Sequence, residues 1–105
     1  MVFLPPPFDG IGRTALLFDH ASPIEQLHRL SAALDSGARF WIKREDSNSG
    51  LASGGNKIRK LEYVLHDALE QKADALVTVG GLQSNHMRQT AAAGARLGIK
   101  VSVQI

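Results

Sequence analysis

One lysine, Lys57, occupies an apolar position of a predicted helix. The residues from about Asn56 to Gln71 predict a helix, and at about 100° per residue its apolar side chains fall in one arc. That arc contains Ile58, Leu61, Val64, Leu65, Ala68, Leu69 and also Lys57. The polar side chains fall outside it: Arg59, Lys60, Glu62, His66, Asp67, Glu70 and Gln71.

Two interpretations of Lys57 are open. A lysine near a helix start can extend its ammonium group to water along its aliphatic stem. However, a cation in the first turn opposes the helix dipole, and apolar surroundings disfavour its charged form. These are the conditions that produce a nucleophilic amine able to form a Schiff base.

The loop before Lys57 is rich in glycine. Gly54 and Gly55 permit the close approach of a flat ligand. The spacing of Gly50, Gly55 and the lysine is similar to that of a phosphate-binding P-loop, but Asn56 intervenes and Ile58 replaces Ser or Thr. No predicted strand leads directly into this loop, so we reject the P-loop interpretation.

A second polar segment, "GGLQSNH" at 80–86, joins an apolar run to a helix. Such a junction presents free backbone N–H groups to an anion, although the G-x-G-x-x-G pattern is absent. Ser84 and Asn85 could be only the N-cap. Alternatively, Ser84 and the N–H groups could hold a carboxylate while the Asn85 amide reaches a ring oxygen. His86 is most simply a polar first-turn residue, and no acidic residue at suitable spacing completes a hydrolase triad.

A third polar segment, "KRED" at 43–46, follows a predicted strand. Taken alone, this pattern indicates a solvated charge cluster.

These segments need a scaffold, and the apolar pattern predicts one of the α/β class. Ser22 and Pro23 predict the N-cap and first residue of a helix near 23–35. Further elements are a strand at 39–43, the Lys57 helix, a strand at 75–80 buried on both faces, a helix from Ser84 or Asn85 to about Leu97, and a strand at 99–105. The order from residue 56 is that of a parallel sheet with flanking helices.

The composition is that of an ordinary globular protein. The chain has 105 residues, a net charge of +2 and no cysteine. The scattered basic residues give no reason to expect nucleic acid, and no apolar run approaches a membrane span of about 20 residues. Without cysteine there is no disulfide or thiolate chemistry, and we expect no metal site. We expect a cytoplasmic protein without membrane or nucleic-acid partners.

The three polar segments together resemble one family of pyridoxal-phosphate enzymes. "KREDSNSGLASGGNKIRKLEY" and "VGGLQSNHMRQTAAA" are similar to the 1-aminocyclopropane-1-carboxylate deaminase and D-cysteine desulfhydrase family, over about residues 22–105. "NSGLA" is closer to the deaminase branch and "QSNH-RQTAA" to the desulfhydrase branch. Ser47 stands where many deaminases have cysteine, and Ser53 where they often have an aromatic residue.

The resemblance implies roles for single residues. Lys57 would hold pyridoxal 5'-phosphate through a Schiff base. Ser84 would lie over the substrate and bind its carboxylate, and Asn85 would hydrogen-bond the phenolic oxygen of the cofactor ring. Gln83 and His86 would line the carboxylate pocket.

The resemblance also implies a fold and an activity. Residues 23–105 would be an incomplete N-terminal part of the tryptophan-synthase-β-like catalytic fold (fold type II). Residues 1–22, which are rich in Pro and Gly and have no clear period, are expected to form an irregular arm before it. Family members are longer, and their glycine-rich phosphate cup lies beyond residue 105. The expected reaction converts 1-aminocyclopropane-1-carboxylate or D-cysteine to a 2-oxo acid and ammonia, in a homo-oligomer when full length. The alternative is a non-catalytic remnant or an interaction fragment of such an enzyme.

Overall fold

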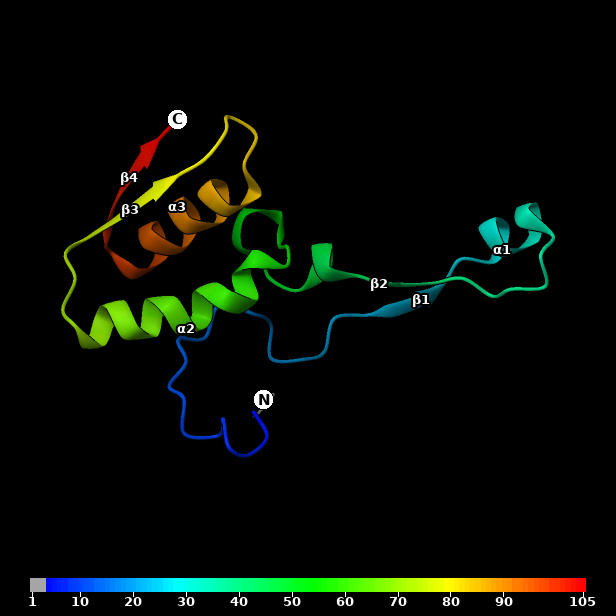
Figure 1. The fold of residues 1–105 in the computed structure, drawn as a ribbon, viewed down its shortest axis with the longest axis horizontal. Coiled ribbons are helices and arrows are strands. Elements are labelled where there is room, and N and C mark those ends of the chain that lie inside the picture. The colour runs from blue at the N-terminus through cyan, green and yellow to red at the C-terminus, as the bar shows by residue number, and fades with distance from the viewer. Residues whose placement is uncertain (1–3) are drawn as a thin grey trace.

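The computed structural model describes residues 4–105, which form a body and a projecting hairpin (Figure 1). The elements in chain order are β1 (Ile24–Gln26), α1 (His28–Leu34), β2 (Trp41–Lys43), two 3₁₀ turns η1 (Glu45–Ser47) and η2 (Leu51–Ser53), α2 (Lys57–Glu70), β3 (Ala75–Val79), α3 (Asn85–Leu97) and β4 (Lys100–Gln104). We call β1, α1 and β2 with their connections, residues 23–43, the extension. No helix within the described residues is long and apolar enough to cross a membrane.

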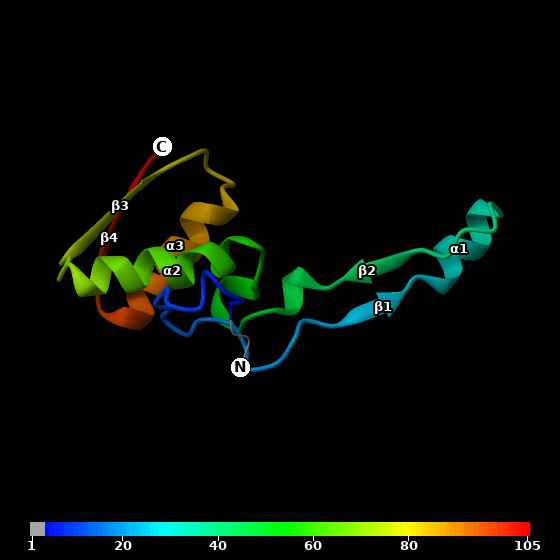
Figure 2. The same ribbon diagram turned by 60° about the horizontal axis from the view of Figure 1, so that its bottom comes forward.

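The parallel pairing predicted for the second half of the chain is confirmed. β3 and β4 pair in parallel, from Ala75 opposite Lys100 to Val79 opposite Gln104. α3 connects the two strands and packs on both, and α2 packs on α3. Both views place the two helices on the same side of this small sheet (Figures 1 and 2).

The prediction that the strand at 75–80 is buried on both faces is wrong for the described chain. Thr78 points to the helices and is buried, whereas Val77 is 70% and Val79 72% exposed. The reason is that both helices lie on one side, so the other face of β3 has no covering layer among residues 4–105.

The core lies where α2, α3 and the arm meet. Its buried apolar side chains are Leu16, Ile58, Leu61, Leu65 and Ala93. The three that come from α2 belong to the predicted apolar arc. The prediction that Glu62 lies outside the buried face of this helix is wrong, because Glu62 is only 1% exposed. Its carboxylate accepts hydrogen bonds from the backbone N–H groups of Leu16 at 2.8 Å and Leu17 at 2.9 Å, and this pairing permits its burial.

The prediction of a continuous helix near 23–35 is also wrong. Residues Ile24–Gln26 instead form β1, which pairs antiparallel with β2, Ile24 lying opposite Lys43. Helix α1 begins only at His28, and Ser22 is not its cap, because the Ser22 hydroxyl donates to Glu45 Oε1 at 2.7 Å. The helical spacing of apolar residues is real, but pairing with a distant strand outweighs local preference.

Candidate active site

Lys57 is the first residue of α2 and is half-buried. The helix start receives no side-chain cap from Asn56. Within residues 4–105 the Lys57 ammonium has neither a hydrogen bond nor an ion pair. The amine is thus not consumed by a structural interaction, unlike the neighbouring Arg59, whose Nη2 donates to Glu45 Oε1 at 2.7 Å.

The loop before Lys57 has an unusual backbone. Four consecutive residues have positive φ: Ala52 at 46°, Ser53 at 59°, Gly54 at 65° and Gly55 at 130°. Side chains rarely adopt such angles, so the two glycines stand where the backbone requires them.

Protein groups, rather than open space, surround the two glycines. A Cβ on Gly54 would lie 2.5 Å from the Asp46 carbonyl oxygen, and one on Gly55 would overlap the Gln89 amide nitrogen. The Asn48 side chain also pairs twice with the Gly55 backbone, as acceptor from its N–H and donor to its carbonyl, both at 3.0 Å. The glycines therefore first serve the packing of this loop.

The start of α3 brings the second predicted segment to the body. Ser84 is the N-cap, and its hydroxyl accepts a long hydrogen bond from Met87 N at 3.3 Å. Asn85 is exposed, with its Oδ1 accepting from Arg88 Nη2 at 3.2 Å, and Gln83 is exposed. The capping role of Ser84 is confirmed, and its ligand-binding role stays a prediction.

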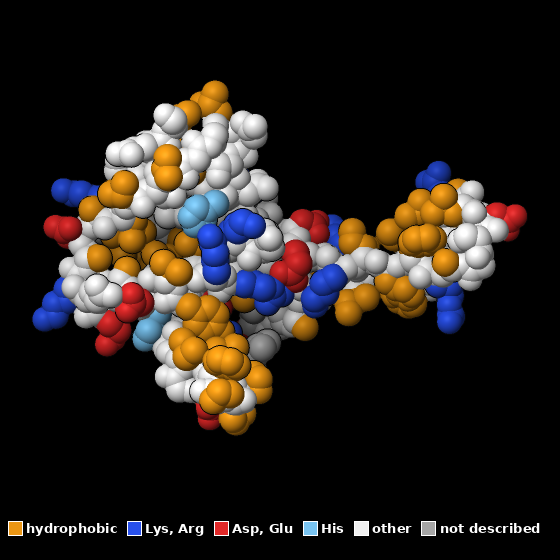
Figure 3. Space-filling model, in the orientation of Figure 1, with side chains coloured by type: hydrophobic (Ala, Val, Ile, Leu, Met, Phe, Trp, Pro, Cys, Tyr) orange, Lys and Arg blue, Asp and Glu red, His pale blue; other side chains and the backbone are white. Residues whose placement is uncertain are grey.

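His86 links this segment to Lys57. Burial and the nearby ammonium groups of Lys60 and Lys57 lower the pKa of the His86 imidazole, which favours its neutral form. Figure 3 shows lysine and arginine side chains gathered beside a histidine between the starts of α3 and α2. His86 Nδ1 is buried and has no hydrogen-bond partner within the described part of the chain. The two helix starts thus share a basic surface, and the His86 Nδ1 atom beside it is buried without a partner among the described residues.

The "KRED" segment is more structural than its pattern indicated. Arg44 pairs with Asp46 at 2.7 Å and with Glu25 at 3.1 Å. Glu45 accepts from Arg59, and this pairing lowers the Glu45 pKa from 4.5 to about 2. The segment therefore ties the extension and the glycine loop to α2.

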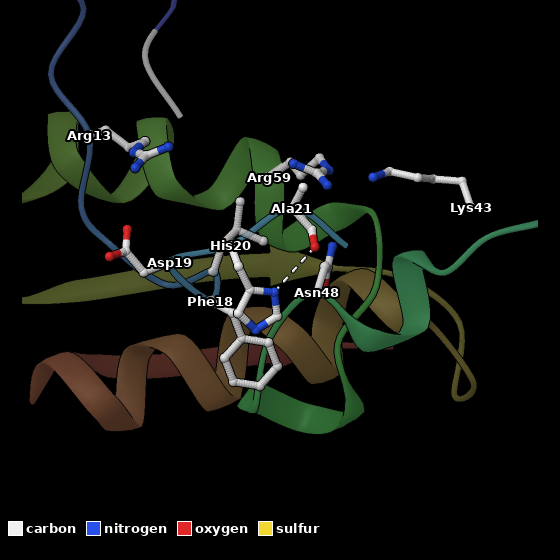
Figure 4. Close-up of a pocket in the computed structure, with 9 residues that line it drawn as sticks. Arg13, Phe18, Asp19, His20, Ala21, Lys43, Asn48 and Arg59 are labelled. Atoms are coloured by element: carbon white, nitrogen blue, oxygen red, sulfur yellow. Dashed lines mark hydrogen bonds between the residues drawn. The ribbon is translucent and has the colours of Figure 1, made fainter. Parts of the chain in front are cut away.

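A separate cavity of about 290 Å³ lies between the arm and α2 (Figure 4). Cationic side chains reach it from three segments, namely Arg13, Lys43 and Arg59. Each already has a protein partner: Arg13 pairs with Glu62, Arg59 with Glu45, and Lys43 Nζ donates to the Ser22 carbonyl at 2.6 Å. None of the five predicted site residues lines this cavity.

Sequence reasoning missed Asn48 and Gln89, which hold the glycine loop. Gln89 is 1% exposed and its Nε2 donates to the Gly54 carbonyl at 2.7 Å. A signal was present, because Gln89 lies four residues before Ala93 on the buried face of α3, just as Lys57 lies on the apolar face of its helix.

Comparison with known proteins supports the sequence resemblance. The model of a family described as pyridoxal-phosphate dependent enzyme matches residues 15–105. The chain is 57% identical over 83 residues to a 1-aminocyclopropane-1-carboxylate deaminase of Bradyrhizobium sp. (strain BTAi1 / ATCC BAA-1182), covering 79% of this chain and 24% of that protein. It is 60% identical over 79 residues to the deaminase of Burkholderia multivorans, covering 75% of this chain and 23% of that protein.

A solved structure agrees with these relatives. A crystal structure described as that of an ACC deaminase homologue superposes with a TM-score of 0.83 at 42% identity, covering 91% of this chain and 28% of that one. The chain thus spans about a quarter of the length of the curated relatives that it matches.

Proposed function

Because the chain belongs to the family of pyridoxal-phosphate dependent enzymes, we propose that Lys57 is the lysine that holds the cofactor in an amino-acid deaminase. The observation that carries this proposal is the half-buried Lys57 amine, which has no partner within residues 4–105. The amine also lies near enough to His86 to lower the pKa of the His86 imidazole.

The residues around Lys57 fit a small polar ligand with negative charge. Lys60 adds a second cation, and the start of α3 adds backbone N–H groups. Buried polar atoms normally have hydrogen-bond partners, so the unpaired His86 Nδ1 marks a place where a group of the ligand could be accommodated. Pyridoxal phosphate combines an aldehyde for the lysine with polar groups around its ring.

Each residue of the site has a proposed task. Lys57 would carry the cofactor, which when bound supplies an electron sink for the reaction at the amino acid. Ser84 would hold the substrate carboxylate together with the N–H groups at the α3 start. Asn85 would donate to the ring oxygen, and Gln83 and His86 would border the carboxylate.

We propose 1-aminocyclopropane-1-carboxylate as the substrate, since the similar deaminases carry that name. The reaction consumes water and releases a 2-oxo acid and ammonia. D-cysteine is the second candidate, favoured by the sequence "QSNH-RQTAA" at the start of α3. From D-cysteine the products would also include hydrogen sulfide.

A labelling experiment tests the lysine. The protein is incubated with pyridoxal phosphate, reduced with borohydride, digested and mapped by mass spectrometry. We expect the pyridoxyl mass on Lys57, and Lys60→Ala as the matched control should still be labelled there. A label on Lys43, Lys60 or Lys72 in the wild type would refute the assignment.

A product assay separates the substrates. Release of 2-oxo acid is measured with 1-aminocyclopropane-1-carboxylate, and release of sulfide with D-cysteine. Lys57→Ala should abolish both releases and leave the circular dichroism spectrum unchanged. The alternative function, a non-catalytic fragment that packs on a longer partner, is favoured by the uncovered face of β3. It predicts no release of either product and co-purification with the longer enzyme.

A further inference from the structure

Gln89 is a polar side chain in the middle of the core. It is among the largest fully buried side chains, at 1% exposure, and Leu16, Ile58 and Leu65 are its apolar counterparts. A buried amide is destabilising unless its donors and acceptor are paired. Gln89 is only partly paired, since its Oε1 has no partner within the described residues. A methionine of similar size would fill the same volume without this cost, so packing alone does not explain the amide.

The Gln89 amide acts on the glycine loop. Its Nε2 donates to the Gly54 carbonyl at 2.7 Å and would overlap a Cβ placed on Gly55. The Asn48 side-chain amide pairs with the Gly55 backbone twice, since its Nδ2 donates to the Gly55 carbonyl and its Oδ1 accepts from the Gly55 N–H. The two glycines are therefore held by two buried side-chain amides, one from the loop itself and one from α3.

This loop needs external support. Four successive residues, 52–55, have positive φ, and two of them are not glycine. Such a backbone persists only when its surroundings hold it. The loop ends two residues before Lys57, so any relaxation of Gly54 and Gly55 would move the start of α2 and the amine that it carries.

The position of Gln89 on α3 gives the hydrogen bond its significance. Gln89 lies one helical turn after Asn85, on the helix that Ser84 caps. The hydrogen bond from Gln89 to Gly54 thus joins the two segments of the proposed site. In the sequence, Lys57 and Ser84 are 27 positions apart.

We propose that Gln89 is a positioning residue whose amide holds the Gly54–Gly55 backbone and thereby sets where the Lys57 amine lies relative to Ser84 and Asn85. This inference rests on the proposed role of Lys57 and adds a residue that touches neither cofactor nor substrate. Gln89 acts through the loop, and its replacement should displace the amine rather than remove a reacting group.

The first test measures the loop without any cofactor. Hydrogen–deuterium exchange is followed in the wild type, in Gln89→Met and in the control Thr90→Val. Thr90 is buried on the same helix and donates only to the His86 carbonyl of its own helix at 2.8 Å, so Thr90→Val loses a buried hydrogen bond without touching the loop. We expect Gln89→Met alone to accelerate exchange across residues 50–57.

The second test measures the amine. Borohydride trapping of pyridoxal phosphate at Lys57 should be roughly tenfold slower or more in Gln89→Met, since small misplacements of reacting groups have effects of this order. The visible absorption band of the bound cofactor should shift as well. In Thr90→Val both the trapping rate and the absorption band should match those of the wild type. This should hold even if the denaturation midpoint of Thr90→Val falls as far as that of Gln89→Met.

The outcomes are separable. Equal exchange and equal trapping in the two variants would overturn the positioning role. Failure of the wild type to label Lys57 would refute the proposed function, while the exchange experiment would still decide whether Gln89 holds the loop. If Gln89→Met does not fold, the exchange rates of the wild type test the proposal. Backbone amides of residues 54–57 that exchange as fast as those of the extension would overturn it. Amides that exchange as slowly as those of α3 would support it.

Discussion

Ser84 illustrates how a single residue can have a structural and a chemical task. It caps α3, so Ser84→Ala should lower the free energy of unfolding by roughly 1 kcal/mol. Ser84→Asp retains a good cap but places a negative charge where the substrate carboxylate is proposed to bind. We expect both variants to lose turnover and only Ser84→Ala to lose stability. Chemical denaturation and initial rates measure the two effects, and wild-type rates in Ser84→Asp would leave Ser84 with the cap alone.

The Glu45–Arg59 pair predicts a pH dependence of stability. Arg59 lowers the Glu45 pKa from 4.5 to about 2, so the ionised carboxylate is favoured in the folded state. The stabilisation is fully present above pH 4.5 and is lost as the pH falls through this window towards 2. Urea denaturation at pH 7 and pH 3 should show a smaller loss in Glu45→Gln than in the wild type. Glu70→Gln, an exposed position on α2, should behave as the wild type.

The site was only partly accessible to sequence reasoning, for a physical reason. Lys57 and Ser84 could be found because each departs from, or completes, a local helical pattern. The helical pattern indicates that Gln89 is buried, but not what it contacts. Asn48 and Gln89 act on backbone groups 7 and 35 positions away, and no local pattern indicates such contacts. The positive φ of Ala52 and Ser53 is equally hidden, since neither residue type favours it.

At the scale of elements, Glu62 decides whether the arm stays on α2. Its side chain accepts from two arm N–H groups, and its backbone carbonyl accepts from Thr14 N at 2.9 Å. Glu62→Leu would leave the two N–H groups unpaired at about 1–3 kcal/mol each. We expect a lower denaturation midpoint and faster proteolysis between residues 10 and 20. Glu70→Leu, on the exposed side of the same helix, should change neither, and an unchanged arm in Glu62→Leu would show that apolar packing alone holds it.

The elements that sequence reasoning predicted well are those whose partners are near in the chain. α2, β3, α3 and β4 follow one another, and each was predicted to within one or two residues of its observed bounds. In the extension, the strand predicted at 39–43 is confirmed as β2, but β1 was predicted as helix. The reason is that β1 gains its structure from β2, whose first residue is 15 positions after the end of β1. A three-residue strand carries too few residues to show a period of its own.

At the scale of the whole molecule, the uncovered face of β3 predicts self-association. Val77 and Val79 stand in water beside the exposed end of the chain, where Ile105 is 79% exposed. Residues 1–105 alone should therefore aggregate on heating. The double variant Val77→Thr, Val79→Thr should raise the temperature at which aggregation begins, as measured by light scattering. Threonine favours strands as valine does, but it exposes less apolar surface.

Val64→Thr is the control for this prediction. Val64 is also exposed, but it lies singly on α2 rather than in a strand. Its replacement should leave the aggregation onset unchanged. An equal gain from Val64→Thr would show that total apolar exposure, and not the open strand face, drives the association.

The projecting extension gives the molecule dimensions of 54 × 37 × 20 Å and a radius of gyration of 17.0 Å. A compact chain of this length would have a radius of about 13 Å. A particle so prolate reorients unequally about its axes, turning easily about the long one and slowly end over end. Amide vectors along the extension strands and along β3 would thus report different apparent correlation times in nuclear spin relaxation, even with no internal motion. In small-angle X-ray scattering the distribution of interatomic distances would have a long tail that arises from the extension.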